Sequence, residues 1–591
     1  MKISDYIKRN WTIVFLIAIS ILPLFDLLRP GLPLTHDGQD HVARIANFYQ
    51  NLTEGNIIPR WAGNLNWGYG HPILEFLYPL PSYLASLFHF FGFTLVDSVK
   101  FVFGISFVLS AITMYFFVKE LLSDEKTALL AGLLYVIAQY RFVDLYVRGA
   151  IGEHVAFIFP PLIFYFLLKL SQAYRHSGES RLGRLQNQTV KRFQNEERAS
   201  GQARMTINYR FVVGGSFSLA GLILSHNAIM IMFLSIIFLY AIYIIWQSSF
   251  NKYLILNTLY ILLLGFGLSS FFLLPAFFEG KYTLRDIVTS GGYVSNFIIN
   301  FKDFVYGQWN YGGTGAFNVQ IGLIHWLLII IAIPMTYILF KKRNKLWIFS
   351  LGSLVIFFLS LFLMTPPSMF IWENITILQK FQFPWRFLSV TVFVSSVIGA
   401  LVVHFLPSNL KMLGIYILIL AVLFFNKDYW HAKGYLIKPE SFFEGIYNGT
   451  TDTGESAPIW SVRFMEKRPK EHIQVINGNA VIKELSRKST VHVYEIDAKE
   501  RSRILENTLY FPGWNVSVDG RKADIEFQDP QHRGLMTFFV EKGKHNIEIK
   551  FGETKLRLFA DIITVATLTV VIFYLAFGLK KNYNPRDEKD K

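Results

Sequence analysis

Four titratable side chains crowd the segment "LTHDGQDHVAR", residues 34–44, which directly follows the first apolar stretch of the chain. They are His36, Asp37, Asp40 and His41. Asp37 and Asp40 are three apart, so on a helix they would share a face. A carboxylate at the border between water and lipid can act as a general base or bind a divalent cation. A helix cap by Asp37 or Thr35 is the alternative, but a cap accounts for one acidic residue and not for four titratable groups.

A second group of ionisable residues lies in "RFVDLYVRGAIGEH", residues 141–154, at the end of one apolar segment and the start of the next. Charged side chains at membrane depth are costly and usually functional. Asp144 and Arg148 could simply form an ion pair one helical turn apart. For Arg148 and Glu153 we favour a functional role.

Three further stretches carry residues suited to binding. In "LSHNA" (224–228), the polar side chains of His226 and Asn227 interrupt a long apolar run. "QKFQFPWRFL" (379–388) places Arg386 at the start of a helix, where it could reach lipid headgroups or clamp a phosphate. "NIIPRWAGNLNWGYGHP" (56–72) contains Trp61 and Tyr69, which suit either a carbohydrate or an interfacial aromatic belt.

The elements that must position these residues are membrane-spanning helices. The 591 residues are 52% hydrophobic and only 17% charged, and apolar runs approach the roughly 20 residues needed to cross a bilayer. There are no cysteines, which excludes disulfides and thiolate metal sites. About twelve spans are predicted, at 11–28, 99–119, 127–145, 155–171, 211–226, 227–246, 253–276, 320–340, 347–364, 386–406, 411–426 and 557–579.

The basic residues predict the orientation of these spans. The loop 171–210, "KKRNK" (341–345) and the tail 580–591 are rich in Lys and Arg, whereas 30–98 is poor in them. The positive-inside rule therefore places both termini in the cytoplasm. We expect 30–98, the turn 146–154, the loops 277–319 and 365–385, and 427–556 to lie outside.

Two segments allow more than one interpretation. The first apolar segment could be a cleaved signal peptide, but it lacks a small-residue cleavage site and is expected to stay as a helix. Residues 76–93 could be a further span. Because that would reverse the charge rule, and because Pro79 and Pro81 interrupt the stretch, we expect an interfacial or re-entrant helix.

The polar stretch 427–556 has alternating segments such as "VHVYEID" and "HNIEIKFG", separated by turn residues. This pattern predicts an extracytoplasmic β-sandwich-like domain. The expected organisation is a transmembrane domain over 1–426, the β-rich domain over 427–556, a last helix over 557–579 and a cytoplasmic tail over 580–591. Tyr510 and Trp514 could contact an acceptor or pack in the core.

The sequence also excludes some classes of protein. It contains no Walker A motif and no glycine-rich turn between a strand and a helix. This argues against an ATP-driven pump and against an enzyme with a cytosolic nucleotide-sugar site. The net charge of +15 lies largely in short loops between spans, so we expect no nucleic-acid partner.

Several motifs, in this order, resemble a known family. "HDGQDHVAR", "PRWAGNLNWGYGHP", "YPLPSYLA", "YRFVDLYVRGAIGEH", "LSHN", "QFPWRFL" and the late "YFPGWNVSVDGRKADI" are similar to the YfhO-like bacterial membrane proteins. The plan of an acidic first external loop, a second acidic position, many spans and an external β domain resembles the GT-C superfamily of polytopic glycosyltransferases. The resemblance covers nearly the whole chain.

This resemblance implies a transferase in the plasma membrane with its active site on the outer face. It would move a sugar from a polyprenyl-phosphate donor to a cell-envelope polymer, a glycolipid or a protein, with an inverting mechanism expected. Asp37 would be the base or would position the acceptor, with Asp40 as its rival. Glu153 matches the second acidic position, which is usually Asp. The donor phosphate would be bound by Arg386, Arg148 and Arg60.

Other site residues and functions follow as expectations. Substrate contacts are expected from His36, His41, Trp61, Tyr69, His226 and Asn227. If a divalent cation such as Mg²⁺ or Mn²⁺ is needed, Asp37, Glu153 and His226 could hold it. Two alternatives remain open: a transporter or flippase of a lipid-linked saccharide, and a non-enzymatic envelope assembly protein.

Overall fold

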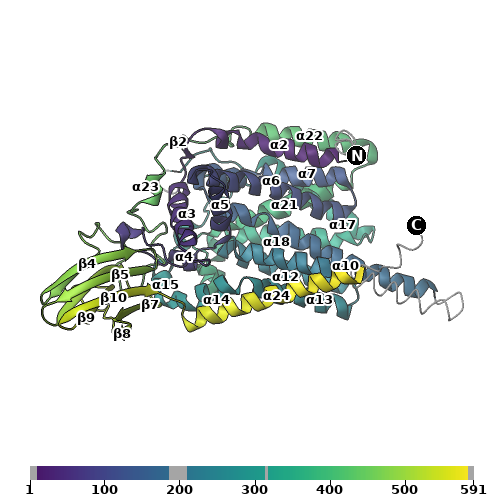
Figure 1. Cartoon of the computed structure of the whole chain (residues 1–591). Coiled ribbons are helices and arrows are strands. Elements are labelled where there is room, and N and C mark those ends of the chain that lie inside the picture. Colours follow the sequence, from purple (N-terminus) through teal and green to yellow (C-terminus); the bar gives the residue numbers. More distant parts are fainter. Residues whose placement is uncertain (1–9, 185–208, 313–316, 583–591) are drawn as a thin grey trace.

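The computed structural model describes residues 10–184, 209–312 and 317–582. Long helices run side by side, and a β-sandwich lies at one end of them (Figure 1). In the same view α2 begins at the end of the bundle away from the sandwich. Helix α24 starts beside the sandwich and runs toward that far end. We call the end that carries the sandwich the sandwich side.

Within the described residues, nine helices are long and apolar enough to cross a bilayer. Helices suit this setting because they satisfy their backbone hydrogen bonds internally. The nine are α2 with η1 (Trp11–Ile21, Leu22–Leu28), α6 (Leu95–Leu122), α9 with α10 (Ile151–Ala156, Phe159–Arg184), α12 (Asn227–Gln247), α17 (Leu323–Lys341), α18 (Leu346–Leu363), η7 with α21 (Pro384–Phe387, Leu388–His404), α22 (Ser408–Asn426) and α24 (Lys555–Asn582).

Two further predicted spans are bent helix pairs. The first joins α7 (Glu125–Val136) to α8 (Gln139–Phe142) and the π-helix η3 (Val143–Arg148), with a bend of 47°. The second joins α13 (Lys252–Leu268) to α14 (Ser270–Phe278) and η4 (Glu279–Tyr282), with a bend of 72°. A shorter apolar helix covers Tyr209–Ile223. The chain is thus a polytopic helical membrane protein, but the expected number of about twelve spans is not confirmed.

The spans differ in how deeply they lie in the bundle. The span that contains α21 is 94% buried in its apolar window, whereas the span of α24 is only 11% buried. Small side chains on α21, such as Ser395, Ser396 and Gly399, permit close approach of neighbouring helices. Helix α21 is therefore central, and α24 lies at the periphery, where its apolar side chains suit contact with lipid.

The loop 30–98 folds on the sandwich side (Figure 1). It contains α3 (Gly38–Thr53), η2 (Asn66–Gly68), α4 (Ile73–Phe76) and α5 (Leu80–Phe90). Helix α5 has 11 residues, too few to cross a hydrocarbon core of about 30 Å. This agrees with the expectation that 76–93 is not a full span.

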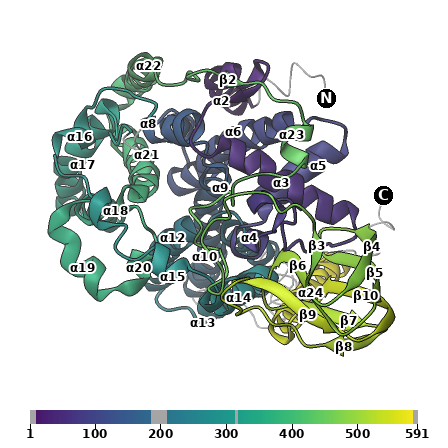
Figure 2. The same cartoon turned by 90° about the vertical axis from the view of Figure 1, so that its left-hand side faces the viewer.

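Short helices occupy the other loops, and none of those described is long enough to span. They are α15 (Arg285–Val288), η5 (Val294–Asn296), α16 (Lys302–Val305), η6 (Pro366–Ser368), α19 (Met369–Asn374), α20 (Thr376–Gln379) and α23 (Ser441–Glu444). Figure 2 views the molecule from the sandwich side and shows α9 near the middle of the helices.

The C-terminal sheet domain is a sandwich of two antiparallel sheets. One has the order β4-β5-β10-β7-β8 and the other β3-β6-β9. The strands are β3 (Ile473–Asn477), β4 (Ala480–Arg487), β5 (Val491–Ala498), β6 (Ser502–Leu509), β7 (Trp514–Val518), β8 (Arg521–Ala523), β9 (Leu535–Val540) and β10 (Gly543–Phe551). Every second residue of β5 is buried, as expected for a strand with one face on a core. Trp514 is 3% exposed, so it packs in this core and is not a surface contact.

Two connections hold the sandwich side together. The short strands β1 (Leu32–Pro33) and β2 (Tyr435–Leu436) pair antiparallel, which ties the first loop to the segment after α22. The guanidinium of Arg557 on α24 is fully buried and contacts Glu75 at 2.8 Å and Glu279 at 2.6 Å. Because buried charges are tolerated when they are paired, this cluster fixes α24 against α4 and η4.

Candidate active site

The carboxylate of Glu153 lies at the centre of a buried group of charged side chains on the sandwich side. Its Oε1 accepts hydrogen bonds from Arg148 Nη2 at 2.8 Å and Arg386 Nε at 3.1 Å. Its Oε2 accepts one from the Tyr140 hydroxyl at 2.8 Å. We call Tyr140, Asp144, Arg148, Glu153, His226 and Arg386 the Glu153 cluster. Its members come from separate helical segments and gather at one end of the bundle.

The local backbone explains how Arg148 and Glu153 meet. The π-helix η3 ends at Gly149, whose φ of 68° is left-handed and favours glycine. The chain then re-enters a helix at α9, so Glu153 folds back toward Arg148. Short π-helical segments such as η3 are frequent at functional sites. Arg148 also donates to Asp144 Oδ1 at 2.6 Å, so the simple ion pair considered from the sequence exists within the larger cluster.

Arg386 approaches the cluster from the start of the central span. Its Nη1 donates to the Phe381 carbonyl at 2.8 Å, while its Nη2 has no hydrogen-bond partner among the described residues. The side chain is 15% exposed. The ring of the neighbouring Trp385 lies 4.3 Å from the Arg148 guanidinium, a distance that suits a cation–π contact. Arg386 therefore retains one donor for a ligand.

His226 and Tyr78 cover another side of Glu153. His226 Nδ1 accepts a hydrogen bond from the backbone N–H of Ile229, so the ring proton of the neutral imidazole lies on Nε2, 3.7 Å from Glu153 Oε1. The ring of Tyr78 lies 4.9 Å from that of His226, and burial raises the pKa of Tyr78 to about 12. Asn227 is exposed and donates to the Phe76 carbonyl.

Asp37 lies beside this cluster with a free side chain. The backbone N–H groups of His36 and Asp37 donate to the carbonyls of Val147 and Arg148, at 2.9 and 2.8 Å. Its exposed carboxylate has no hydrogen bond or ion pair with any residue in the described part of the chain. Thr35 Oγ1 accepts from the Gly38 N–H instead. Capping therefore does not explain Asp37.

The other titratable groups of α3 are engaged. Asp40 Oδ1 accepts from the Tyr447 hydroxyl at 2.7 Å, and Tyr447 in turn accepts from Gln39. Burial raises the pKa of Asp40, although the Tyr447 hydrogen bond and the charge of Arg44 act to lower it. His41 Nδ1 accepts from Arg44 at 2.9 Å. Burial and the charge of Arg44 hold the pKa of His41 well below its usual range, so this ring is neutral.

Some predicted site residues lie elsewhere or are exposed at the edge. His36 is exposed, with Nε2 3.1 Å from the Tyr311 carbonyl. Arg60 contacts Glu553 at 3.0 Å and Asp561 at 2.9 Å, and it also donates to the Phe271 carbonyl. Because its guanidinium is already paired near α24, the expectation that Arg60 joins Arg148 and Arg386 is not met.

The expected carbohydrate contacts of the first loop are also not free. Trp61 is 1% exposed and packs edge-on against Trp514 at 5.4 Å. Tyr69 is half-buried against the core of the sandwich, and its carbonyl accepts from the Leu509 N–H. These residues fasten the sandwich to the loop 30–98. Sequence reasoning missed these partners because they lie far along the chain.

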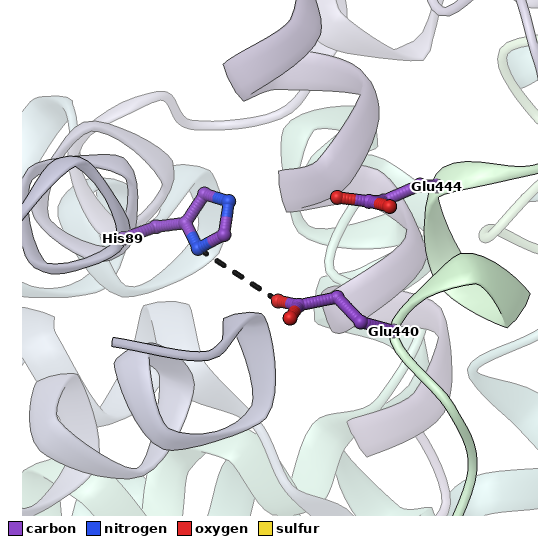
Figure 3. A group of neighbouring side chains, drawn as sticks. All are labelled: His89, Glu440 and Glu444. Atoms are coloured by element: carbon purple, nitrogen blue, oxygen red, sulfur yellow. Dashed lines mark ion pairs between the residues drawn. The ribbon is translucent and has the colours of Figure 1, made fainter. Parts of the chain in front are cut away.

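The predicted metal ligands do not form a cation site. Glu153 already binds two guanidinium groups, which repel a divalent cation, and Asp37 makes no contact with Glu153 or His226. Among the described residues, the group with suitably close ligand atoms is His89, Glu440 and Glu444, all within 4.8 Å (Figure 3). There His89 Nδ1 contacts the Phe93 carbonyl and Glu440 accepts from the Leu95 N–H. His89 and Glu440 thus already have partners within the protein.

A cavity of about 620 Å³ lies among four helices, two of which follow Glu153 and His226 in the chain. It is lined by apolar side chains of α10, α12, α13 and the helix Tyr209–Ile223, among them Ile163, Leu167, Leu219, Leu234 and Phe238. Leu234 lies eight residues after His226 on α12, or about 12 Å further into the bundle. Glu153, on α9, likewise lies before the first turn of α10, on the sandwich side of the cavity-lining residue Ile163. The cavity is therefore an apolar groove that shares the span α9–α10 and helix α12 with the cluster.

Replacing Gly152 tests the packing that surrounds Glu153. A Cβ at this position would lie 2.1 Å from the Tyr78 ring, so Gly152→Ala must displace Tyr78. We expect a loss of about 1–3 kcal/mol in the free energy of unfolding and reduced activity. Gly352→Ala is the matched control, since beyond the backbone of its own helix and its chain neighbours no atom lies within 4 Å of the added Cβ. Thermal unfolding in detergent measures both; equal stability of the two variants would contradict the packing.

Comparisons with known proteins are sparse. No protein family profile matches the chain. An uncharacterized protein of Lactococcus lactis subsp. cremoris is 24% identical over 375 residues, which cover 61% of this chain and 55% of that protein. The chain thus spans about half the length of this relative. The family resemblance of the motifs is not confirmed by these matches.

Similar solved structures include an oligosaccharyltransferase from the archaeon Archaeoglobus fulgidus. The apo Archaeoglobus fulgidus oligosaccharyltransferase is 12% identical, with a TM-score of 0.37 over 76% of this chain and 60% of that chain. AglB from the same organism, in complex with an inhibitory peptide and a dolichol-phosphate, is 13% identical, with a TM-score of 0.39 over 77% and 61%. TM-scores below 0.5 do not establish a shared fold.

Proposed function

We propose that the protein is a GT-C-type glycosyltransferase that moves a sugar from a polyprenyl-phosphate donor to an extracytoplasmic acceptor. The observation that carries this proposal is the position of Asp37. A free carboxylate is fixed through its backbone to the carbonyl of Arg148, next to a cluster that contains Arg148 and Arg386. A base beside an anion-binding group is what transfer from a phosphate-linked sugar requires.

The phosphate of the donor would bind at Arg386. This guanidinium has a free Nη2 among the described residues and is partly exposed, and its planar fork suits phosphate oxygens. Glu153 holds Arg386 and Arg148 in place and has no free oxygen for a second role. His226 Nε2 and the Tyr140 hydroxyl complete the orientation of Glu153. Glu153 is therefore assigned a positioning role instead of a catalytic one.

The hydrocarbon chain of such a donor would lie in the apolar groove. The groove is lined in part by α10, which follows the helix α9 that carries Glu153, and by α12, which begins directly after His226. A polyprenyl chain cannot leave the bilayer, so its binding site must open between helices. The polar cluster and the apolar groove thus match the two ends of one amphipathic ligand.

The transfer step uses the Asp37 carboxylate as its base. Asp37 removes the proton of the acceptor hydroxyl as its oxygen attacks the anomeric carbon. The bond between that carbon and the phosphate oxygen breaks, and the electron pair leaves with polyprenyl phosphate, next to Arg386. A single displacement of this kind inverts the anomeric configuration. The acceptor would be a cell-envelope polymer, a glycolipid or a protein.

The direct test uses purified protein in liposomes with a polyprenyl-phosphate sugar labelled in the sugar. A set of donors with different sugars and a cell-envelope extract as acceptor cover the unknown specificity. We expect label in the acceptor and an equal amount of released polyprenyl phosphate. Movement of the lipid-linked sugar across the bilayer with its phosphate bond intact would instead identify a transporter.

The orientation of the molecule in the plasma membrane can be tested separately. We propose that the sandwich side faces outward and that both termini are cytoplasmic. Since the chain has no cysteine, single cysteines give a clean signal. Lys542→Cys, at an exposed turn of the sandwich, is expected to react with an impermeant maleimide in intact cells. Arg343→Cys, in the exposed turn between α17 and α18, should react only after permeabilisation; the opposite pattern would invert the proposed topology.

A further inference from the structure

Arg141 is a fully buried guanidinium without an ion-pair partner among the described residues. It belongs to α8, one residue from Tyr140 of the Glu153 cluster. Its Nη2 donates to Ser110 Oγ at 3.2 Å, whereas its Nε and Nη1 have no hydrogen bond within the described part of the chain. An unpaired charge at membrane depth is costly and suggests a function.

The surroundings of Arg141 explain how it is tolerated. Its guanidinium carbon lies 3.9 Å from the centre of the Phe157 ring, 5.3 Å from Phe107 and 5.9 Å from Tyr135. Aromatic faces stabilise a cation by about 0.5–2 kcal/mol each. The cage holds the cation in place but does not neutralise its charge, which therefore acts on nearby groups.

Asp144 is the acidic residue nearest to Arg141 along the chain. The two residues are three apart, on either side of the change from α8 to the π-helix η3. Asp144 Oδ1 binds Arg148, but Asp144 Oδ2 is buried without a partner among the described residues. Asp144 forms its ion pair with Arg148, and no ion pair within 4 Å joins it to Arg141 in the described part of the chain.

The charge of the whole group depends on Arg141. Asp144 and Glu153 would cancel the charges of Arg148 and Arg386, because these four residues form a closed set of ion pairs. With Arg141 included, three guanidinium groups face two carboxylates. These five side chains then carry one net positive charge, counted without the exposed carboxylate of Asp37, and this charge favours an anionic ligand next to Arg386.

We propose that Arg141 is a positioning residue for the phosphate of the lipid donor, acting through Asp144. By offsetting the Asp144 carboxylate, it leaves Arg148 and Arg386 with positive charge directed at the phosphate. This inference rests on the proposed function and extends it, since it assigns the affinity for the donor to a residue that never touches it.

Four variants test this role by charge alone. Arg141→Gln removes the positive charge and is expected to raise KM for the donor about tenfold. This is the effect of one charge several ångströms away in partly desolvated surroundings. The value of kcat should change by less than about twofold. Arg141→Lys keeps the charge and should stay close to wild type. The double variant Arg141→Gln/Asp144→Asn restores the net charge and should recover most of the affinity. Asp144→Asn alone should lower KM.

A binding measurement separates this inference from the proposed function. Polyprenyl monophosphate is titrated into each purified variant, and the rise in the thermal unfolding temperature gives its affinity. If wild type does not bind this lipid, the proposed function fails and the inference with it. If wild type and Arg141→Gln bind equally, only the role of Arg141 is overturned. Should Arg141→Gln fail to fold, unchanged or weaker binding by Asp144→Asn would overturn it as well.

Discussion

Asp37→Asn is expected to reduce sugar transfer by about 10²–10⁴-fold while the protein folds and inserts normally. The rate falls because an amide cannot accept the proton of the acceptor hydroxyl, and a general base contributes this much. Stability should change by less than about 0.5 kcal/mol, since the side chain is exposed and makes no bond within the described structure. Transfer is measured as label in the acceptor, with thermal unfolding as the check on folding.

Asp40→Asn is the matched control for this prediction. It lies one turn along the same helix, but its carboxylate accepts a hydrogen bond from Tyr447, which an asparagine oxygen can also accept. We expect a smaller loss of transfer than for Asp37→Asn. Full activity of Asp37→Asn, or a larger loss for Asp40→Asn, would move the base away from Asp37.

Glu153→Gln is expected to have the largest effect on stability. The substitution leaves Arg148 and Arg386 close together without the carboxylate that binds both, at 2.8 and 3.1 Å. Breaking a buried ion pair from one side costs about 3–5 kcal/mol. Thermal unfolding in detergent should show a large drop, and transfer should be lost with it.

An exposed carboxylate on the same side serves as the control for Glu153. Glu373 lies on α19, is exposed and has no ion pair among the described residues. Glu373→Gln should therefore unfold at the wild-type temperature. If Glu153→Gln is equally stable, then Glu153 does not hold the two guanidinium groups, and the description of the cluster is incorrect.

Much of the fold could be predicted because the signals are local. A bilayer requires long apolar helices, so hydropathy located the helices, and strand alternation located the sandwich. The bends in the two helix pairs were not predicted from the sequence. The sequence pattern continues as a single apolar run through the break after Val136 and into the π-helix at Val143–Arg148, so hydropathy alone does not mark them.

The candidate site, like the fold, could be predicted where the signal is local and not where it depends on contacts between distant parts of the chain. Arg148, Glu153, His226 and Arg386 stood out because ionisable groups at the ends of apolar runs need a reason, and the structure brings them together. Arg60 and Trp61 lie in a stretch whose composition also suggested ligand binding. Their partners in the structure, Asp561 and Trp514, lie far along the chain. Tyr447 was missed for the same reason, since only the fold brings it to Asp40.

The central claim is that one amphipathic donor binds with its phosphate at Arg386 and its chain in the groove of α10 and α12. A structure of the protein with bound polyprenyl monophosphate tests this most directly. We expect a phosphate oxygen within hydrogen-bonding distance of Arg386 Nη2, beside Asp37, with the hydrocarbon chain passing Leu234 and Ile163. A phosphate bound away from Arg386, or a chain outside this groove, would contradict the account.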